Sequence, residues 1–175
     1  MDFTFTSTEE TAATRVPFYE DARADFAPYY ASGKSVKVAK QEVAVELSKL
    51  DGVVLAFREG FFGEGRGRRY GYEIDFLLRD PAGRDHRGLL RVAGLPMRRE
   101  TPAKVEQVRV QALLNVRDWV KAAVTQPVFQ PGAGHPLLMN LLVDGRRTVA
   151  EYLGAGGRLA ALAEGDVIEG EFRQA

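Results

Sequence analysis

The sequence predicts an α+β domain in which an antiparallel meander of three or four strands is covered on one face by two helices. Helical spacing of apolar residues runs from about Lys34 to Leu50. Three strand-like stretches with short connections follow between Val53 and Leu95, and a second helical pattern begins at Thr101. The expected order is helix, three strands, helix, with a C-terminal helical extension.

The first 33 residues are expected to form an irregular segment that includes a short strand. Phe3 and Phe5 alternate with threonines, which is typical of an edge strand. Pro17 and Pro28 interrupt any long helix between them. Residues 34–125 then form the predicted α-β-β-β-α core, and residues 126–175 are an extension of the same single domain.

The first helix is predicted from about Lys34 to Leu50, with Gly52 as its stop signal. Its apolar residues recur at three- and four-residue steps: Val36, Ala39, Val43, Leu47 and Leu50. Lys34, Lys37 and Lys40 crowd its first two turns, where the helix dipole disfavours cations. These lysines form either a solvated face or part of a binding surface.

The three strands are predicted at Val53–Phe62, Arg69–Arg79 and Arg87–Leu95, with a turn at Asp80–Gly83. The second strand alternates most clearly, and one of its faces is apolar: Tyr70, Tyr72, Ile74, Phe76 and Leu78. The two tyrosines follow two arginines, which partly matches the RNA-binding signature of RNA-recognition motifs. The continuous apolar face favours burial in the core over base stacking.

The opposite face of the second strand carries Glu73 and Asp75. With Arg58 and Arg91 on the neighbouring strands, these acids are expected to form cross-strand ion pairs. The alternative is a metal-dependent nuclease site. Such a site also needs an acid and a lysine on the third strand, where Leu89 and Arg91 stand.

The second helix is predicted to start with Thr101 as N-cap and Pro102 as its first residue. We expect it to run to about Thr125 and to end because of Pro127. The remaining predicted elements are an apolar element at Leu137–Val143, a turn at Asp144–Gly145, a helical turn capped by Thr148, a short helix at 158–163, and an acidic end whose residues 166–172 are either solvated or a strand.

Composition excludes several classes of function. The chain has no cysteine, which removes disulfides and thiolate chemistry. His86 and His135 lack ligand-spaced companions, so no metal and no other cofactor is expected. No catalytic motif is present, which favours a non-enzymatic protein. Because no long apolar run and no leader pattern occur, we expect a soluble, cytoplasmic protein without a membrane partner.

The net charge is zero, but the segment from Arg58 to Lys104 holds 11 basic and 7 acidic residues, a net charge of +4. In a meander, the turn at Gly63–Arg69 and the end of the third strand lie at the same pole. If the first helix packs antiparallel to the first strand, the starts of both helices lie there too. The expected phosphate-binding residues at this pole are Arg66, Arg68, Arg69, Arg98, Arg99, Lys34, Lys37, Lys40 and Lys104. We expect only Glu64 and Glu100 as acids among them.

The order of elements from Lys34 to Thr125 resembles that of double-stranded-RNA-binding domains. In this resemblance, which is one of topology, the basic cluster at the second helix start corresponds to Arg98, Arg99 and Lys104.

Two hypotheses follow. The first is a non-enzymatic nucleic-acid-binding accessory protein that binds the phosphates of DNA or RNA at the pole, largely without reading sequence. The second is a structural or assembly protein that self-associates or binds a protein partner through its apolar element at Leu137–Val143. An enzyme that acts on a phosphorylated small molecule is the third possibility.

Overall fold

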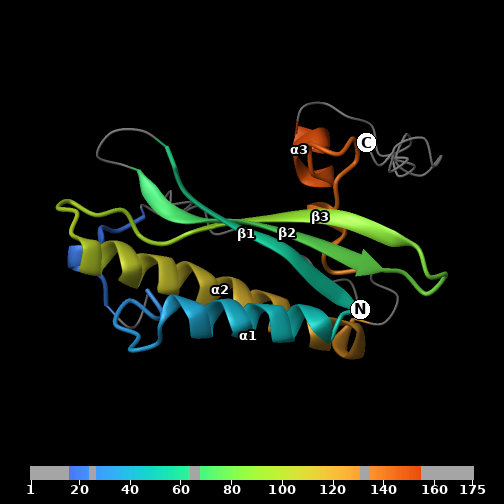
Figure 1. The fold of residues 1–175 in the computed structure, drawn as a ribbon, viewed down its shortest axis with the longest axis horizontal. Helices are drawn as coiled ribbons and strands as arrows, with labels where there is room; N and C mark the ends of the chain where they lie inside the picture. The colour runs from blue at the N-terminus through green and yellow to red at the C-terminus, as the bar shows by residue number, and fades with distance from the viewer. Residues whose placement is uncertain (1–15, 24–26, 64–67, 131–134, 155–175) are drawn as a thin grey trace, which may run out of the picture.

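The computed structural model describes residues 16–23, 27–63, 68–130 and 135–154. Its centre is an antiparallel sheet in the order β1-β2-β3, formed by β1 (Gly52–Phe62), β2 (Arg69–Arg79) and β3 (Asp85–Ala93). Two long helices, α1 (Val36–Ser48) and α2 (Pro102–Phe129), lie side by side on one face of the sheet (Figure 1). Three short elements complete the fold: η1 (Tyr19–Asp21), η3 (Leu138–Asn140) and α3 (Val149–Gly154). The predicted α+β class with an antiparallel sheet is confirmed.

The described residues contain three strands and not a fourth. At the outer edge of β3, Leu141 forms an isolated antiparallel bridge with Gly88, which extends the sheet by one residue pair. The predicted strand at residues 3–6, the helix at 158–163, the possible strand at 166–172 and most of the turn between β1 and β2 lie outside the described residues.

Local sequence accounts for both ends of α1. The side-chain oxygen of Ser35 accepts a hydrogen bond from the backbone N–H of Val38 at 3.3 Å, which caps the helix start. Gly52, the predicted stop, instead begins β1, and Asp51 takes the left-handed conformation that ends the helix, with φ of 55°. Glycine is still required at 52, because a Cβ there would lie 2.8 Å from the carbonyl oxygen of Leu47.

β2 supplies the centre of the core. The side chains of Tyr72, Ile74 and Phe76 are fully buried beneath the helices, where they meet Leu113 and Leu114 of α2. Each large apolar side chain that is fully buried stabilises the fold by about 1.5–3 kcal/mol. The interpretation as core is therefore confirmed for Tyr72 and not for Tyr70, which is only partly buried and donates to Glu100 at 2.9 Å.

α2 begins as predicted, since the side chain of Thr101 accepts a hydrogen bond from the backbone N–H of Lys104 at 3.3 Å. The predicted end is wrong: the helix continues through Pro127 to Phe129. A proline so close to the C-terminus removes only one hydrogen bond of the ladder. Beyond the proline, the N–H of Gln130 still donates to the carbonyl of Gln126 at 2.8 Å.

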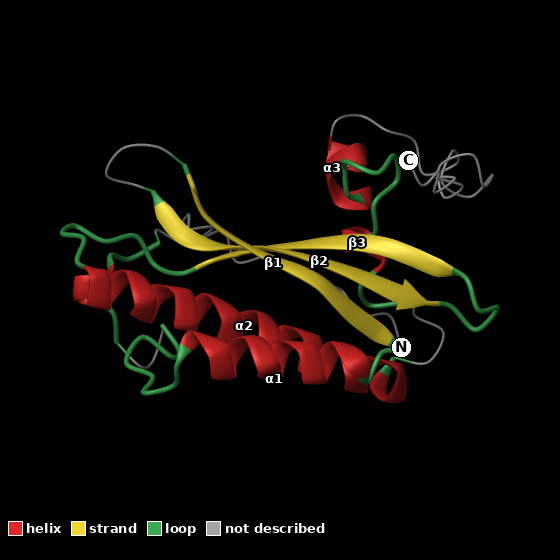
Figure 2. Cartoon of the chain, viewed as in Figure 1, coloured by secondary structure: helices red, strands yellow, loops and turns green. Residues whose placement is uncertain are grey.

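The segment after α2 returns to the sheet and packs within this chain. Leu137 is fully buried in the main core, and Val143 is also buried. The backbone N–H of Leu142 donates to the carbonyl of Arg87 at 2.8 Å. Figure 2 shows α3 on the side of the sheet opposite the two long helices. Of the proposed partner-binding element, Leu138 and Met139 stay substantially exposed, whereas both ends are buried.

α3 starts with a capping box. The backbone N–H of Thr148 donates to Glu151 Oε2 at 2.9 Å, and the N–H of Glu151 donates to Thr148 Oγ1 at 3.2 Å. Thr148 therefore caps this helix as the sequence predicted. Among the helices of the described residues, none combines the length and the apolarity needed to cross a membrane.

Candidate nucleic-acid interface

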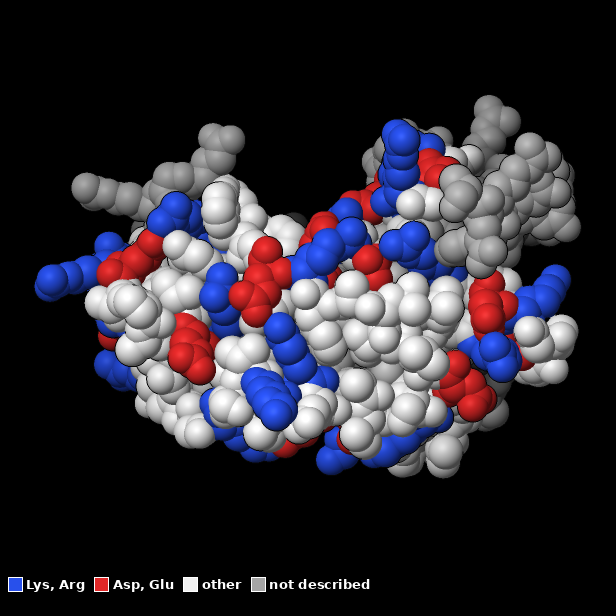
Figure 3. Space-filling view, in the orientation of Figure 1, with Lys and Arg blue, Asp and Glu red and all other residues white. Residues whose placement is uncertain are grey.

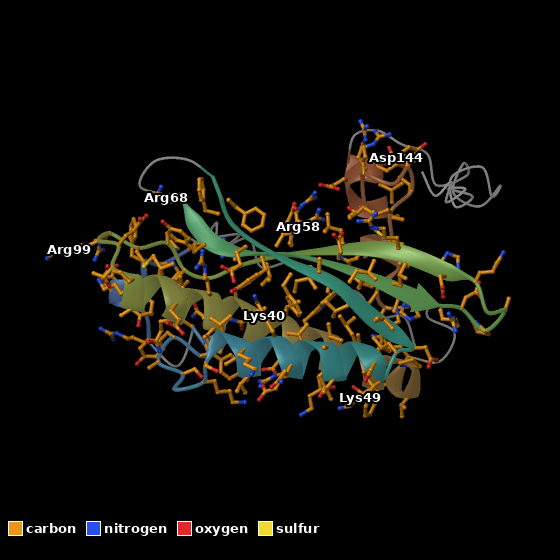
Figure 4. All side chains as sticks on the ribbon, viewed as in Figure 1. Lys40, Lys49, Arg58, Arg68, Arg99 and Asp144 are labelled. Atoms are coloured by element: carbon orange, nitrogen blue, oxygen red, sulfur yellow. The ribbon has the colours of Figure 1, made fainter. Side chains whose placement is uncertain are left out.

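The ends of several elements meet at one pole of the molecule, as Figure 4 shows around Arg68 and Arg99. Lys40 of α1 lies 3.0 Å from the Glu59 carboxylate near the end of β1, and Arg109 of α2 lies 3.5 Å from the same carboxylate. Arg68, just before β2, forms an ion pair with Glu100, just before α2. These contacts place the starts of both helices beside the β1–β2 end of the sheet. We call this region the basic pole.

Two of the predicted phosphate-binding residues are exposed with unpaired side chains. Lys37 lies in the first turn of α1, and Arg99 lies in the loop that leads to α2. Neither side chain has a hydrogen-bond or ion-pair partner within the part of the chain that the structure describes. Arg66 lies outside those residues.

Two other predicted residues, Arg98 and Lys104, form ion pairs with acids of η1. Arg98 donates two hydrogen bonds to Asp21 of η1, one of them at 2.8 Å, and covers the ring of Phe18 at 4.9 Å. Lys104 lies 2.7 Å from a carboxylate oxygen of Glu20.

Arg68 binds Glu100 with two nitrogens, the Nε–Oε1 distance being 2.6 Å. Its guanidinium also lies over the rings of Phe61 and Tyr70, at 5.3 and 5.4 Å. These aromatic contacts orient Arg68 along the rim of the sheet.

The two remaining lysines of the α1 cluster are also paired. Lys34 lies 2.5 Å from Glu42, two turns further along the helix. Lys40, besides contacting Glu59, lies 5.5 Å from the ring of Phe57 and 5.0 Å from that of Tyr72. Lys40 thus links α1 to the sheet, whereas Lys34, just before the helix, pairs with a residue of α1 itself.

Arg69 has a structural role. Its guanidinium donates to the carbonyl oxygens of Gly94 at 2.8 Å and Ala93 at 3.2 Å, where β3 ends. Burial lowers the pKa of Arg69 from its ordinary value. The side chain is therefore committed to the sheet and is not free to bind phosphate.

The prediction of only two acids at this pole is wrong. Glu100 is present and Glu64 lies outside the described residues, but four further carboxylates pair with the predicted cations: Glu20, Asp21, Glu42 and Glu59. The first two arrive because the backbone N–H of Tyr19 bonds to the carbonyl of Pro96 at 2.8 Å, which anchors η1 beside the loop before α2. The only sequence signal for them is the adjacent pair of acids, which gives no hint of its tertiary position.

A modest excess of positive charge remains at the basic pole. Its described cations number nine when Arg109 is included, and its carboxylates number six when Glu106 is included, a net charge of +3. Figure 3 shows positive and negative side chains interspersed over this end of the molecule. The pole is thus a mixed surface with a positive balance, not a uniformly basic patch.

The hydrogen bonds at the pole keep its acids ionised. A hydrogen bond from Lys40 lowers the pKa of Glu59, and one from Arg68 lowers the pKa of Glu100. Burial alone would raise the pKa of Glu20, but hydrogen bonds from Lys104 and from backbone N–H groups outweigh it and lower the pKa to about 2.

A pocket of about 540 Å³ opens between the starts of α1 and α2. Its apolar wall includes Val36, Pro102 and Val105. Its polar groups come from Glu59, Tyr72, Glu100, Glu106 and Arg109. The Tyr72 hydroxyl donates to Glu59 at 3.2 Å, and burial raises the pKa of Tyr72 well above its usual value. No sequence pattern indicates this pocket, because its wall combines residues of four separate elements.

The open face of the sheet carries the predicted cross-strand ion pairs. Asp75 is buried and lies 2.5 Å from Arg58 and 3.4 Å from Arg87. Glu73 lies 2.9 Å from Arg91, which also pairs with Glu151 at the start of α3. The ion-pair interpretation is confirmed, and the carboxylates are occupied by arginines.

The histidines stand apart from one another. His86 contacts Asp80 at 3.0 Å, and burial lowers the pKa of His135. In the described residues, no group of three or more histidines or carboxylates is arranged to hold a metal ion. No protein-family model, no curated protein and no solved structure matches this chain.

Proposed function

We propose that the protein is a non-enzymatic nucleic-acid-binding accessory protein that binds phosphates at the basic pole, largely without reading sequence. The observation that carries this proposal is the position of Lys37 and Arg99. Both are exposed, both lack a side-chain partner within the described residues, and both stand at the start of a long helix. Free cations beside helix N-termini suit a phosphate group.

Two of the paired arginines at the pole are able to join them. The side chains of Arg68 and Arg98 are 37% and 55% exposed. Ion pairs at such exposure contribute about 0–1 kcal/mol to stability. A phosphate can therefore replace the carboxylate of Glu100 or Asp21 at little cost in free energy. The better-buried Arg69 instead keeps its hydrogen bonds to the backbone carbonyls at the end of β3.

This arrangement implies weak binding that depends on salt. Two unpaired cations give about two phosphate contacts, and the two exchangeable arginines raise the number to about four. The logarithm of the binding constant on duplex DNA should then fall with the logarithm of salt concentration with a slope of about −2 to −4.

The test compares two double variants that each remove two positive charges. Lys37→Ala with Arg99→Ala removes the free cations of the pole. Lys121→Ala with Arg146→Ala removes two exposed cations that lie on other parts of the molecule. We expect the first pair to reduce duplex binding about tenfold at low salt and the second to change it little. Equal losses in both would contradict a specific pole.

A second candidate function is self-association through the free edge of the sheet. β1 pairs only with β2 within the described residues, and Val53 and Leu55 on it are 61% and 48% exposed. Figure 3 shows an uncharged surface just right of the centre of the view, where α1 runs beside β1 in Figure 1. An exposed apolar edge strand is a ready site for pairing with a second copy.

The test for this candidate is molar mass by light scattering after size exclusion. Self-association predicts a dimer for the wild type and a monomer for Val53→Lys, which places a charge on the edge. A wild-type chain that stays monomeric at the highest attainable concentration would exclude this candidate.

A further inference from the structure

The pocket at the basic pole does not suit a phosphate. Glu59, Glu100 and Glu106 contribute carboxylates to its wall, and a phosphate placed inside would face all three. The free cations Lys37 and Arg99 are not among the residues that line it. If the proposed function is correct, phosphates bind at the rim and the pocket receives another part of the nucleic acid.

The walls of the pocket combine apolar side chains with groups that donate and accept hydrogen bonds, as binding of a nucleobase requires. Val36, Pro102 and Val105 form an apolar wall. The carboxylates accept hydrogen bonds, and Arg109 donates them, since it lines the pocket and lies 3.5 Å from the carboxylate of Glu59. The volume of about 540 Å³ lies within the range of about 300–1,000 Å³ that small-molecule sites occupy.

The carboxylates differ in their capacity for new bonds. Glu59 already accepts from Lys40 and Tyr72, and Glu100 already accepts from Arg68 and Tyr70. Glu106 is exposed and has no side-chain partner within the described part of the chain. Glu106 is therefore the acceptor that a ligand meets first, with Arg109 one helical turn away as the donor.

We infer that this pocket binds an unpaired nucleobase that carries an exocyclic amino group, such as cytosine. A carboxylate accepts from the amino group, and a guanidinium donates to the ring carbonyl. Thymine presents a carbonyl in place of the amino group and would face Glu106 with an unfavourable contact. A base in a duplex has this edge occupied, so single strands bind the pocket and duplexes bind only the rim.

This inference rests on the proposed function, and one set of measurements separates the two. Fluorescence anisotropy is measured with labelled oligo(dC), oligo(dT) and duplex DNA of about 12 nucleotides. The wild type should bind oligo(dC) about ten times more tightly than oligo(dT). In Glu106→Ala, this preference should disappear, while the affinity for oligo(dT) rises because a negative charge is lost.

The matched control is Asp21→Asn, which removes a negative charge from the pole outside the pocket. It should tighten the binding of both oligonucleotides equally and keep the preference for oligo(dC). Thermal unfolding confirms that each variant folds.

Each outcome has a distinct meaning. Equal binding of oligo(dC) and oligo(dT) by the wild type would overturn the base pocket and leave phosphate binding at the pole intact. A preference that survives Glu106→Ala would overturn the assignment of this carboxylate to the base. If none of the three probes shows salt-sensitive binding, the proposed function is overturned, and the base pocket with it.

Discussion

Replacing Asp21 by Asn should strengthen nucleic-acid binding, because this acid holds one of the arginines of the basic pole. Asp21 and Arg98 are 48% and 55% exposed, so loss of their ion pair should cost only about 0.2–1 kcal/mol of stability. The freed guanidinium then lies next to Arg99, which is already unpaired. In the wild type, Asp21 competes with phosphate for Arg98, so its removal adds at most one phosphate contact and makes the salt slope steeper by up to about 0.9 on duplex DNA.

This change has a measurable size. When the salt concentration is lowered from about 200 to about 50 mM, one additional contact makes the rise in the affinity of Asp21→Asn about 3.5 times larger than the rise for the wild type. The assay is fluorescence anisotropy of a labelled duplex at several salt concentrations. Unchanged affinity and slope in Asp21→Asn would refute the reasoning that carboxylates of η1 mask the pole.

The matched control is Asp144→Asn, which removes the same charge and releases Arg147 far from the pole (Figure 4). Its affinity and slope should stay close to those of the wild type. If both variants gain equally, the gain reports net charge and not the release of a particular arginine.

The other predictions concern stability. The folded-state pKa of Glu20 is about 2, below its ordinary value of 4.5, so its ion pair with Lys104 contributes stability above about pH 4.5 and loses it as the pH falls towards 2. Glu20→Gln should therefore lower the melting temperature at neutral pH and have little effect near pH 2. An equal effect at both pH values would contradict this linkage. Leu137→Ala should cost about 2–5 kcal/mol in urea unfolding, whereas Leu138→Ala should cost about 0.5 kcal/mol or less; similar costs would show that Leu137 is not in the core. Thr148→Ala should cost about 0.5–2 kcal/mol in the same assay through loss of the α3 cap, and an unchanged stability would contradict a stabilising cap at α3.

The elements of the core could be predicted from the sequence because local rules determine them. The period-two pattern of β2 identified Tyr72, Ile74 and Phe76 as one face, and all three are buried. The Thr101–Pro102 pair marked the start of α2, and Thr148 marked that of α3. These signals need no knowledge of distant residues.

The predicted ends of α1 and α2 are wrong in detail, because the position of each residue in the fold outweighs its usual local role. Pro127 was expected to end α2, but it stands in the last turn, where a missing N–H costs a single bond and the helix continues. Gly52 was expected to end α1 by its conformational freedom. The structure uses the same glycine for close packing beneath Leu47 and leaves the left-handed conformation to Asp51.

The charge balance of the candidate site could not be predicted. The convergence of the cations follows from the topology of the meander, but their partners come from distant parts of the chain. Lys104 meets Glu20, which is 84 residues earlier, and Arg98 meets Asp21. Only the packing of η1 against the loop before α2 brings these acids to the pole, and no periodic pattern encodes that contact.

The salt dependence of duplex binding by the wild-type chain is the most direct test of phosphate binding at the basic pole. Anisotropy titrations between about 50 and 200 mM salt should give a linear relation between the logarithms of the binding constant and of the salt concentration, with a slope of about −2 to −4. Binding that is absent at the lowest salt concentration, or that does not change across this range, would contradict the account.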